Sequence, residues 1–579
     1  MQFYIDIVNA ALIVAVLGFS VNLLVGYTGL VSMAQGAVYG VGSYAAAVAA
    51  TKAGLPFPLT ILASIAAATL VSVLMSWPAL RVKGEYLILL TLAVQLVLSG
   101  VYEAWVPVTG GTSGIAGIPQ PAFGAEFPGP GTLLPFVLAV FVVGFGVSLW
   151  VGHSPFGRTL RVIREDESAA ESVGKHVTYY KVAVFALAGA LAGLAGGTYA
   201  HYQAFVNPVS FSLDQSIFLM AVVVLGGAGN LFGTVIGAAV LASFPQLLLL
   251  ANFDNQVAAV AQRFLYGLLL VLFMLYRPQG LVPEYFRLRR RTPGRPLGRD
   301  LAEIQITDLN FCKITAKGGS VVLRATDLHK SFDGVKPADG LSMVLPAGRI
   351  TALVGPNGAG KTTVFNLLTG FVPPDRGRVT LHAEDITHLP TWQRARRGLV
   401  RSFQDVRICE GLSVLDNVRT AIPRQAGETV GSLLLAPAVI RARRAHVEAA
   451  MSYLEFVGLA GRANEPAAAL PFGEHKLLAI ARLLATEADV LLLDEPASGV
   501  DRAWAERVLD LIRRLADEGK TICLVEHNLD VVRALADRAY FMDAGRIIAE
   551  GTPEELMADE HLAAVYFGTR SGRPGHAGG

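Results

Sequence analysis

The stretch that decides the fold of the second half of this chain is Gly355-Pro356-Asn357-Gly358-Ala359-Gly360-Lys361-Thr362. An apolar run, Ile350 to Val354, precedes it, and a helix-forming stretch, Thr363 to Leu368, follows it. Glycines let the backbone turn tightly, so that successive N–H groups point at phosphate oxygens. A strand, a glycine-rich loop and a helix in this order predict a loop that binds nucleotide phosphates.

The side chains of this loop predict ATP and Mg²⁺ as its ligands. Lys361 has the reach to contact the outer phosphates, and the Thr362 hydroxyl is expected to ligate the Mg²⁺ ion. The nucleotide-binding residues predicted here are Gly355, Pro356, Asn357, Gly358, Ala359, Gly360, Lys361, Thr362 and Thr363.

A second block of chemical groups follows the apolar run Val490 to Leu493, which predicts a buried strand. Two carboxylates, Asp494 and Glu495, end that run. We expect Asp494 to hold Mg²⁺ directly or through water. We expect Glu495 to polarise the attacking water as a general base. The sequence therefore predicts hydrolysis of ATP.

Composition divides the chain into two parts. It has 579 residues and a net charge of +2, and residues 1–280 hold only 20 of its 94 Asp, Glu, Lys and Arg residues. A chain of this length exceeds one core, so at least two domains are expected. The small net charge gives no support to a nucleic-acid partner. The three cysteines, Cys312, Cys409 and Cys523, lie far apart and predict neither a disulfide framework nor a metal cluster.

The first 280 residues contain apolar runs of the length that crosses a lipid bilayer, which is about 20 residues. A further run, Ser216–Leu225, is short and either spans or re-enters. We therefore predict eight or nine membrane segments. The long candidates are Ile5–Val25, Leu30–Ala50, Leu59–Leu80, Tyr86–Trp105, Leu133–Val151, Val182–Tyr202, Phe232–Ala251 and Val257–Tyr276.

Basic residues predict the orientation of these segments, because cytosolic loops carry an excess of Lys and Arg. One basic group lies around Arg81, a second between Arg158 and Lys181, and a third from Arg277 to Arg291. All three fall on the cytosolic side if the short segment spans, which favours nine spans and an N-terminus outside. The count starts from the ATPase half, which must be cytosolic because that is where ATP is.

Glycine-rich breaks interrupt the apolar runs at Gly26–Gly29 and Gly226–Asn230. Small residues permit close packing of helices. Broken helices can also open the backbone toward a substrate path. Both interpretations stay open, with packing favoured.

Several stretches of residues 1–285 resemble the branched-chain amino acid permease family. The stretches are Leu23-Leu24-Val25-Gly26-Tyr27-Thr28-Gly29-Leu30-Val31-Ser32-Met33-Ala34-Gln35-Gly36-Ala37, Thr109-Gly110-Gly111-Thr112-Ser113-Gly114-Ile115, Ser154-Pro155-Phe156-Gly157-Arg158, Leu225-Gly226-Gly227-Ala228-Gly229-Asn230 and Arg277-Pro278-Gln279-Gly280-Leu281. The resemblance implies one permease subunit of an ABC importer that receives its solute from an extracytoplasmic binding protein.

The charged loop Gly157–Lys181 keeps apolar residues at near-helical spacing. A solvated connector would explain the charge alone. An amphipathic coupling helix seated in a groove of an ATPase would explain both features, and the family resemblance favours that interpretation.

The soluble half resembles the ATP-binding subunits of ABC transporters, those of branched-chain amino acid importers in particular. The resemblance implies that Phe332 stacks on adenine, that Gln404 senses Mg²⁺, water and the permease, and that His527 contacts the γ-phosphate. Ser498-Gly499-Val500-Asp501 and Ala564-Val565-Tyr566-Phe567-Gly568 are similar to further blocks of that family.

The signature segment departs from the family pattern, since it reads Leu470-Pro471-Phe472-Gly473-Glu474-His475. The family has a serine where Pro471 stands, and proline offers neither a hydroxyl nor an N–H donor. Gly473 and the helix after it still direct N–H groups at phosphate. In this family the signature contacts the ATP of the partner domain, so we predict two unequal ATP sites.

The sequence thus predicts a multi-domain protein with a polytopic α-helical membrane domain followed by an α/β P-loop ABC ATPase domain. The predicted boundaries are 1–286 for the permease domain, 287–320 for a linker, 321–570 for the ATPase domain and 571–579 for a disordered tail. One phosphate loop and one signature imply a partner, either a second permease and a second ATPase subunit or another copy of this chain.

The expected activity is ATP-driven import of branched-chain or related amino acids across the bacterial cytoplasmic (inner) membrane. Urea, amides or aromatic acids are alternative solutes. A less favoured alternative is an ABC exporter half-molecule, which usually has six long spans.

Overall fold

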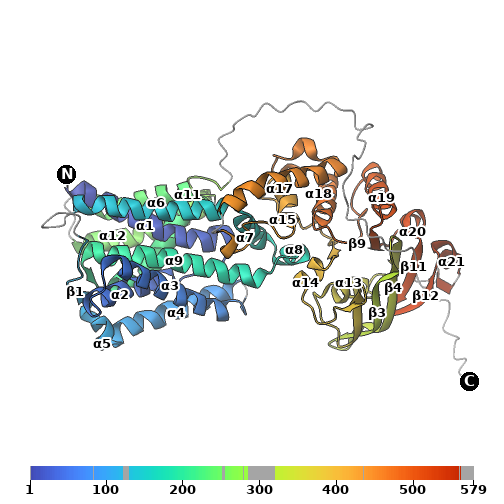
Figure 1. Ribbon diagram of the computed structural model, residues 1–579, viewed down its shortest axis with the longest axis horizontal. Helices are drawn as coiled ribbons and strands as arrows, with labels where there is room; N and C mark the ends of the chain where they lie inside the picture. The colour runs from blue at the N-terminus through green and yellow to red at the C-terminus, as the bar shows by residue number, and fades with distance from the viewer. Residues whose placement is uncertain are drawn as a thin grey trace, which may run out of the picture. The chain divides into compact units, whose positions relative to one another are not determined.

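The computed structural model describes residues 2–82, 84–121, 130–250, 255–277, 279–284, 320–433, 436–559 and 561–562. Contacts divide the chain into two compact units. Unit 1 comprises residues 1–165, 177–292 and 427–434, and unit 2 comprises residues 166–176, 293–426 and 435–579. Figure 1 shows unit 1 as mainly helices and unit 2 as strands with helices. Each unit includes one short segment from the other half of the sequence.

Unit 2 contains two sheets. The larger has the strand order β12-β11-β5-β10-β9-β8, and the smaller has the order β4-β3-β6-β7. In the larger sheet β11 and β12 pair antiparallel, and the other neighbours pair parallel. The strands are β3 (Val321–Phe332), β4 (Val335–Pro346), β5 (Ile350–Val354), β6 (Arg376–Leu381), β7 (Glu384–Asp385), β8 (Leu399–Arg401), β9 (Val490–Asp494), β10 (Thr521–Val525), β11 (Arg538–Asp543) and β12 (Arg546–Gly551).

The central strands β5, β9 and β10 are buried along their whole length. Their side chains alternate between two hydrophobic clusters, as the period of two in a strand requires. Leu491 and Leu493 of β9 belong to one cluster, and Val490 and Leu492 belong to the other. A strand that is covered on both faces is largely apolar. This explains the apolar runs before Asp494 and before the phosphate loop, where Thr351 is the one polar residue.

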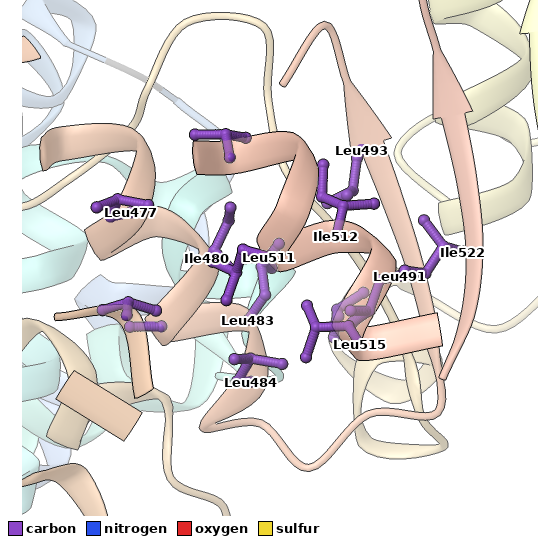
Figure 2. Close-up of a cluster of buried hydrophobic side chains, with 14 of the residues drawn as sticks. Leu477, Ile480, Leu483, Leu484, Leu491, Leu493, Leu511, Ile512, Leu515 and Ile522 are labelled. Atoms are coloured by element: carbon purple, nitrogen blue, oxygen red, sulfur yellow. The ribbon is translucent and has the colours of Figure 1, made fainter. Parts of the chain in front are cut away.

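Helices cover this sheet. Figure 2 shows leucines and isoleucines of α18 (Phe472–Leu484) and α19 (Arg502–Asp517) gathered against Leu491, Leu493 and Ile522 of the sheet. The remaining unit 2 helices include α8 (Glu167–Ser172), α13 (Lys361–Thr369), α14 (Thr391–Arg396), α15 (Val414–Ala421), α17 (Ala436–Val457), α20 (Leu529–Leu535) and α21 (Pro553–Ala558).

Unit 1 is mainly helical, and a helix overlaps each of the predicted apolar segments. The predicted segment Leu30–Ala50 is only partly helical, because α2 begins at Gln35 and has 17 residues. Five of its helices, among the described residues, are long and apolar enough to cross a membrane: α1, α3, α4, α6 and α9. The number of spans stays a prediction. The helices are α1 (Gln2–Thr28), α2 (Gln35–Thr51), α3 (Phe57–Ala79), α4 (Glu85–Ala104), α5 (Val106–Thr109), α6 (Pro130–His153), α7 (Pro155–Glu165), α9 (Val177–Gln203), α10 (Leu213–Gly226), α11 (Leu231–Leu250), α12 (Asn255–Tyr276) and α16 (Val430–Leu433).

Glycines of α9 bring its backbone against α2 and α3. A Cβ atom on Gly193 would lie 2.7 Å from Ser64 O, and one on Gly196 would lie 2.5 Å from Tyr39 O. Hydroxyls join the same helices, since Ser64 Oγ donates to Gly193 O at 2.6 Å and Ser43 Oγ donates to Gly196 O at 3.0 Å. Small residues and polar contacts are the usual means of helix association in lipid.

The break at Gly226–Asn230 is also a place of close packing. A Cβ on Gly227 would lie 2.1 Å from Val282 O, and one on Gly26 would lie 2.3 Å from Gly229 N. Leu281 N and Val282 N donate to Leu225 O and Gly226 O, at 2.8 and 3.0 Å. The described contacts therefore favour the packing interpretation of both glycine breaks over an open substrate path.

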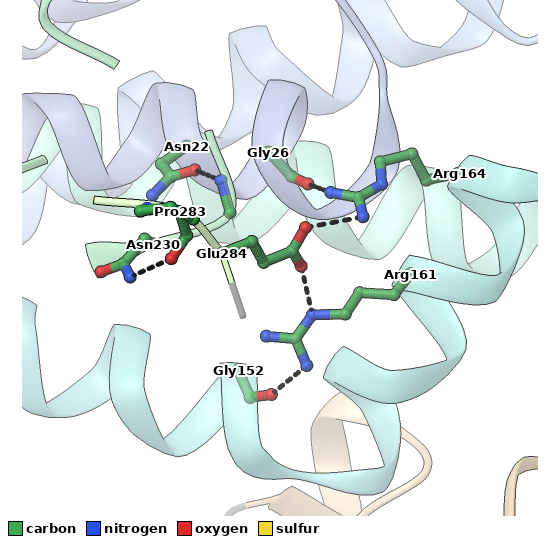
Figure 3. A network of polar contacts seen from close by, with 9 residues as sticks. Asn22, Gly26, Gly152, Arg161, Arg164, Asn230, Pro283 and Glu284 are labelled. Atoms are coloured by element: carbon green, nitrogen blue, oxygen red, sulfur yellow. Dashed lines mark hydrogen bonds and ion pairs between the residues drawn. The ribbon is translucent and has the colours of Figure 1, made fainter. Parts of the chain in front are cut away.

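A polar cluster, Glu284 with Arg161 and Arg164, joins the residues after α12 to α7 (Figure 3). Glu284 accepts from Arg161 Nε at 2.8 Å and from Arg164 Nη2 at 2.7 Å. Arg164 also donates to Gly26 O at the end of α1, and Arg161 donates to Gly152 O at 3.2 Å. These arginines were predicted as cytosolic loop charges, and the structure pairs them within unit 1.

The predicted coupling helix is divided between the units. A single helix was expected in Gly157–Lys181, but α7 ends at Glu165 and α8 begins at Glu167. The cause is Asp166, which has an extended backbone and caps α8 by accepting from Ala169 N at 2.9 Å. Only the segment Asp166–His176 belongs to unit 2.

Candidate active site

The phosphate loop lies between β5 and α13 of unit 2. Two of its glycines are required by close approach, since a Cβ on Gly355 would lie 2.0 Å from Met542 O and one on Gly360 would lie 2.2 Å from Pro337 O. Gly360 also has a φ of +106°, which L side chains rarely adopt. Asn357 and Gly358 are exposed at the tip of the loop, whereas Gly355 and Ala359 are buried.

Helix α13 begins at Lys361, so the first N–H groups of a helix face the loop, as an anion site requires. Lys361 Nζ donates to Gly355 O at 2.7 Å and to Pro356 O at 2.9 Å. Burial lowers the pKa of Lys361, and the nearby Glu495 and Asp494 oppose that change. Thr362 is exposed and Thr363 is half-buried on the first turn.

Asp494 ends the buried strand β9, where its side chain is 2% exposed. Burial raises the pKa of Asp494, and the guanidinium of Arg401 works in the opposite direction. Arg401 Nη2 donates to Asp494 Oδ2 at 2.7 Å, and Ser402 Oγ accepts from Asp494 N at 3.0 Å. The Arg401 bond thus holds the carboxylate of Asp494, and the Ser402 bond holds its backbone, at the carboxyl end of the sheet.

Glu495 is the point at which the predicted catalytic residues meet. Gln404 Nε2 donates to Glu495 Oε2 at 3.1 Å, and His527 Nδ1 lies 3.6 Å from Glu495 Oε1. Glu495 has a φ of +47°, a strained value for a residue with a side chain. Strain of this kind collects at functional sites. Three segments far apart in sequence thus bring Gln404, Glu495 and His527 together.

Phe332 and Gly473 are not among the contacts of that group. Phe332 ends β3 beside the two-residue turn Asp333–Gly334, whose residues both have positive φ, and its ring is 45% exposed. Gly473 lies on α18, where a Cβ would lie 2.8 Å from the ring of Trp504. Lys476 on the same helix donates from Nζ to Glu495 O at 3.0 Å, which joins the signature helix to the catalytic strand.

The signature helix α18 begins without a side-chain cap. Pro471 occupies the N-cap position, and its carbonyl accepts from Glu474 N at 3.0 Å and from His475 N at 3.1 Å. The serine of the family pattern would normally cap such a helix. Phe472, the next residue, is 50% exposed.

The oxygen donors fit a Mg²⁺ ion that is held chiefly by nucleotide. Thr362, Gln404 and Asp494 offer a hydroxyl, an amide and a carboxylate, the donors that Mg²⁺ prefers. No group of three or more His, Cys, Asp or Glu residues suited to a metal occurs in the described part of the chain. Mg²⁺ is commonly held by one or two carboxylates together with substrate phosphates.

Arg401 is a residue of this site that sequence reasoning missed. Its side chain is 3% exposed, its Nη1 donates to Asn366 Oδ1 of α13, and its guanidinium lies 5.4 Å from the ring centroids of Phe365 and Phe403. Arg401 therefore connects Asp494 to the helix of the phosphate loop. It stands three residues before Gln404, but nothing in that spacing predicts an ion pair with Asp494.

The segment Asp166–His176 packs within unit 2. Asp166 pairs with Arg407 at 3.0 Å, Arg396 Nε donates to Gly174 O at 2.9 Å, and His176 stacks on Trp392 with ring centroids 4.4 Å apart. Val173 belongs to the larger hydrophobic cluster. A pocket of unit 2 is lined by residues of this segment and of the cassette: Ala169, Ser172, Val173, Arg401, Ser402, Phe403, Val406, Arg407, Ala479, Arg482 and Leu483.

A phosphate loop, a carboxylate pair at the end of a parallel strand and a signature helix together define an ATP-hydrolysing ABC cassette. Residues 338–498 match the family described as ABC transporter. Residues 3–274 match the family described as branched-chain amino acid transport system, permease component. The chain therefore belongs to the branched-chain amino acid ABC transporter family, as a permease component fused to an ATP-binding component.

The relatives match the ATPase half. The chain is 38% identical over 249 residues to the high-affinity branched-chain amino acid transport ATP-binding protein LivG of Salmonella typhimurium, a match that covers 43% of this chain and 98% of LivG. It is 34% identical over 249 residues to BraF, the corresponding protein of Pseudomonas aeruginosa. That match covers 43% of this chain and 98% of BraF.

The chain is also similar in sequence to an ATP-binding cassette whose structure is solved. The ADP conformation of MJ1267, an ATP-binding cassette of an ABC transporter, is 33% identical, and the match covers 43% of this chain and 99% of that one, with a TM-score of 0.39.

Proposed function

We propose that this chain imports branched-chain or related amino acids as the fused permease and ATPase subunit of a binding-protein-dependent transporter. The observation that carries the proposal is the meeting of Gln404 and His527 on Glu495, within a chain whose other half matches a permease. The permease domain is proposed to span residues 1–286, the linker 287–320, the ATPase domain 321–570 and the tail 571–579. Two parts of this proposal lie outside the described residues: the linker before Ser320, and residues 563–579, which include the block 564–568.

The ATPase residues divide the work of hydrolysis. Lys361 and the N–H groups of Gly355 and of residues 357–363 hold the phosphates, and Phe332 stacks on the adenine. Asp494, Thr362 and Gln404 would hold Mg²⁺, which would supply positive charge to the phosphates. Glu495 accepts the proton of the attacking water, and Gln404 and His527 fix the carboxylate and the water in position.

The cassette works in a pair, because the signature of one domain meets the ATP of the other in this family. The proposed partner set is a second permease and a second ATPase subunit, with a copy of this chain as the alternative. Gly473 contacts the partner's nucleotide. Since Pro471 supplies neither a hydroxyl nor an N–H, the ATP that meets this signature is expected to turn over more slowly.

The pair is proposed to lie in the bacterial cytoplasmic membrane, with the ATPase on the cytosolic side and a soluble binding protein outside. The five long apolar helices and the cytosolic supply of ATP support this placement. Closure of the ATPase pair would act on the segment Asp166–His176 and switch the permease between outward and inward access.

The test begins with purification of the full chain and its partners from native membranes. The associated binding protein is screened for thermal stabilisation by leucine, isoleucine, valine, urea, amides and aromatic acids. The stabilising solute is then offered to proteoliposomes that contain the complex. We expect uptake that requires ATP and the binding protein. Steady ATP hydrolysis without accumulation of any stabilising solute would contradict import, and ATP-dependent release of solute would favour an exporter.

A further inference from the structure

The segment Gly427–Leu434 stands out because it lies in the ATPase half of the sequence yet packs in unit 1. It follows α15 and precedes α17, and it contains the one-turn helix α16. Figure 1 places α15 and α17 among the helices of unit 2. The chain therefore leaves the helices of the cassette and returns to them within a few residues.

The segment has its own local structure. Thr429 and Ser432 bond each other reciprocally, with Ser432 N donating to Thr429 Oγ1 at 3.3 Å and Thr429 N donating to Ser432 Oγ at 3.0 Å. Leu433 N closes the turn on Thr429 O at 2.9 Å. Side chains of this kind fix a short turn by replacing absent backbone partners. These bonds lie within the segment itself and do not involve other helices.

Four hydrogen bonds tie the segment to the ends of three helices. Two go to the end of α6 and the start of α7, where Trp150 Nε1 donates to Leu433 O at 3.0 Å and Phe156 N donates to Gly427 O at 3.1 Å. Two go to the first turn of α9. They join Val430 N to Tyr179 OH at 3.1 Å, and Tyr180 OH to Glu428 Oε1 at 3.1 Å.

The bond to Gly427 completes the start of α7. Pro155 has no N–H, and the next donors after Phe156 are satisfied locally, since Gly157 N bonds Ser154 Oγ at 3.1 Å and Arg158 N bonds Ser154 O at 3.1 Å. Phe156 N instead donates to the Gly427 carbonyl. The first N–H groups of any helix need an external acceptor, so this carbonyl acts as the remaining cap of α7.

Burial makes these bonds specific. Phe156, Tyr180, Glu428 and Leu433 are each at most 5% exposed, and the rings of Phe156 and Tyr180 lie 5.3 Å apart. A buried polar group that loses its partner is unfavourable. The buried hydrogen-bonding groups of the segment therefore have their partners on the three helix ends, and separating the two would leave these groups unpaired.

We propose that Gly427–Leu434 is a docking segment through which the ATPase half of this chain recognises its permease half, with the end of α6 and the starts of α7 and α9 as the binding surface. Helices α7 and α9 flank Asp166–His176, the segment that packs with the cassette. The contacts of Gly427–Leu434 with α7 and α9 therefore lie on either side, in sequence, of the segment that contacts the cassette. This inference rests on the proposed function for its purpose in coupling, but not for its geometry.

The first test is photo-crosslinking of the full chain in native membranes. A benzophenone amino acid replaces Tyr179, and in the matched control it replaces Tyr199, which lies on the same helix with its ring 5.5 Å from that of Tyr39. We expect position 179 to crosslink to the peptide that contains residues 427–434, and position 199 to crosslink to α2. Crosslinks from position 179 to lipid or to other segments alone would overturn the proposal.

The second test measures coupling. Glu428→Leu removes the acceptor of Tyr180, and Glu448→Leu, an exposed carboxylate on α17 paired with Arg444, serves as the control. Hydrogen exchange of the peptide spanning α7 is followed with and without Mg-ATP. We expect the ATP-dependent change in exchange to fall about fivefold in Glu428→Leu and to persist in the control. An unchanged response in Glu428→Leu would refute a coupling role.

The two tests separate this inference from the proposed function. Crosslinking needs neither hydrolysis nor transport, so it can succeed even if the vesicles import no solute. If import is confirmed and position 179 does not crosslink to residues 427–434, the docking proposal is refuted and the proposed function is not.

Discussion

Unit 2 and unit 1 both contain buried charged residues, but they use them differently. In unit 2 the buried Asp494 is followed in sequence by Glu495, whose side chain is 17% exposed. Glu495 contacts His527, whose side chain is 54% exposed. In unit 1 the Glu284 side chain, 10% exposed, is bonded by two arginines that also bind backbone carbonyls. A reactive site keeps polar atoms within reach of a ligand, whereas a structural cluster satisfies them internally.

The largest expected effect concerns the reactive side of this comparison. Glu495→Gln removes the general base, so we expect ATP turnover of the purified complex to fall about 10²- to 10⁴-fold while ATP still binds. Steady-state phosphate release and nucleotide binding would be measured together. Glu506→Gln on the exposed face of α19 is the control. A loss of less than about tenfold would remove Glu495 from the proposed role.

A second change asks whether Arg401 supports the reactive group. Arg401→Leu leaves Asp494 buried without its ion-pair partner, a change that typically destabilises by about 3–5 kcal/mol. Hydrogen exchange of peptides from β9 in the full chain would report the loss. Arg397→Leu breaks an exposed pair with Glu384 and should change stability by less than about 1 kcal/mol. If both variants changed the hydrogen exchange of β9 equally, Arg401 would not be the residue that stabilises Asp494.

The polar cluster of Glu284, Arg161 and Arg164 in unit 1 should affect local stability and not ATP turnover. Glu284→Gln weakens two charge-assisted hydrogen bonds, which we expect to destabilise the attachment of α7 locally by about 2 kcal/mol. In Glu284→Gln, hydrogen exchange of the α7 peptide should rise. ATP turnover of this variant, measured in the same way as for Glu495→Gln, should change little. Glu85→Gln, an exposed residue at the start of α4, is the matched control. Loss of turnover comparable to that of Glu495→Gln would break the comparison.

The smallest effect is a pH dependence of the four-stranded sheet. Hydrogen bonds from Arg546, Lys330 and Thr387 hold the pKa values of Asp339, Asp375 and Asp385 below their usual range. Because the folded pKa values are lowered, the stabilisation is present above the unfolded pKa and is lost as pH falls below about 4.

Acid unfolding of the full chain would test this sign. We expect the unfolding midpoint temperature to fall between about pH 5 and pH 3, and the fall to be shallower in Asp375→Asn. Asp375 and Asp385 are exposed, and Asp339 is half-buried, so solvent screens most of these interactions and the change is small. A midpoint that rises on acidification would contradict it.

The predicted strands of the ATPase half were found where the sequence placed them, because local chemistry dictates their pattern. Strands β5 and β9 are apolar apart from Thr351 and Asp494, since both faces are covered. The phosphate loop follows β5, and Asp494 and Glu495 sit at the carboxyl end of β9, as the motifs predicted. The contacts of Gln404 and His527 with Glu495 agree with the assigned roles, which remain proposals.

Long-range pairings escaped the sequence analysis because they leave no local spacing. Glu284 lies 120 residues from Arg164 in sequence, and the order of residues around it gives no sign of the pair. The same holds for Arg401 with Asp494, and for Gly427 with Phe156. The break in the coupling segment at Asp166 was missed for a different reason, since a capping residue inside a near-helical pattern divides it without disturbing its period.

The central claim is that ATP binding in unit 2 acts on the permease through the segment that connects α7 to α9. The most direct measurement is hydrogen exchange of residues 155–180 in the Glu495→Gln complex, purified with its partner subunits, before and after saturation with ATP. The account predicts a change in exchange across α7 and Asp166–His176 on ATP binding alone. Saturated ATP binding with unchanged exchange in that stretch would contradict it.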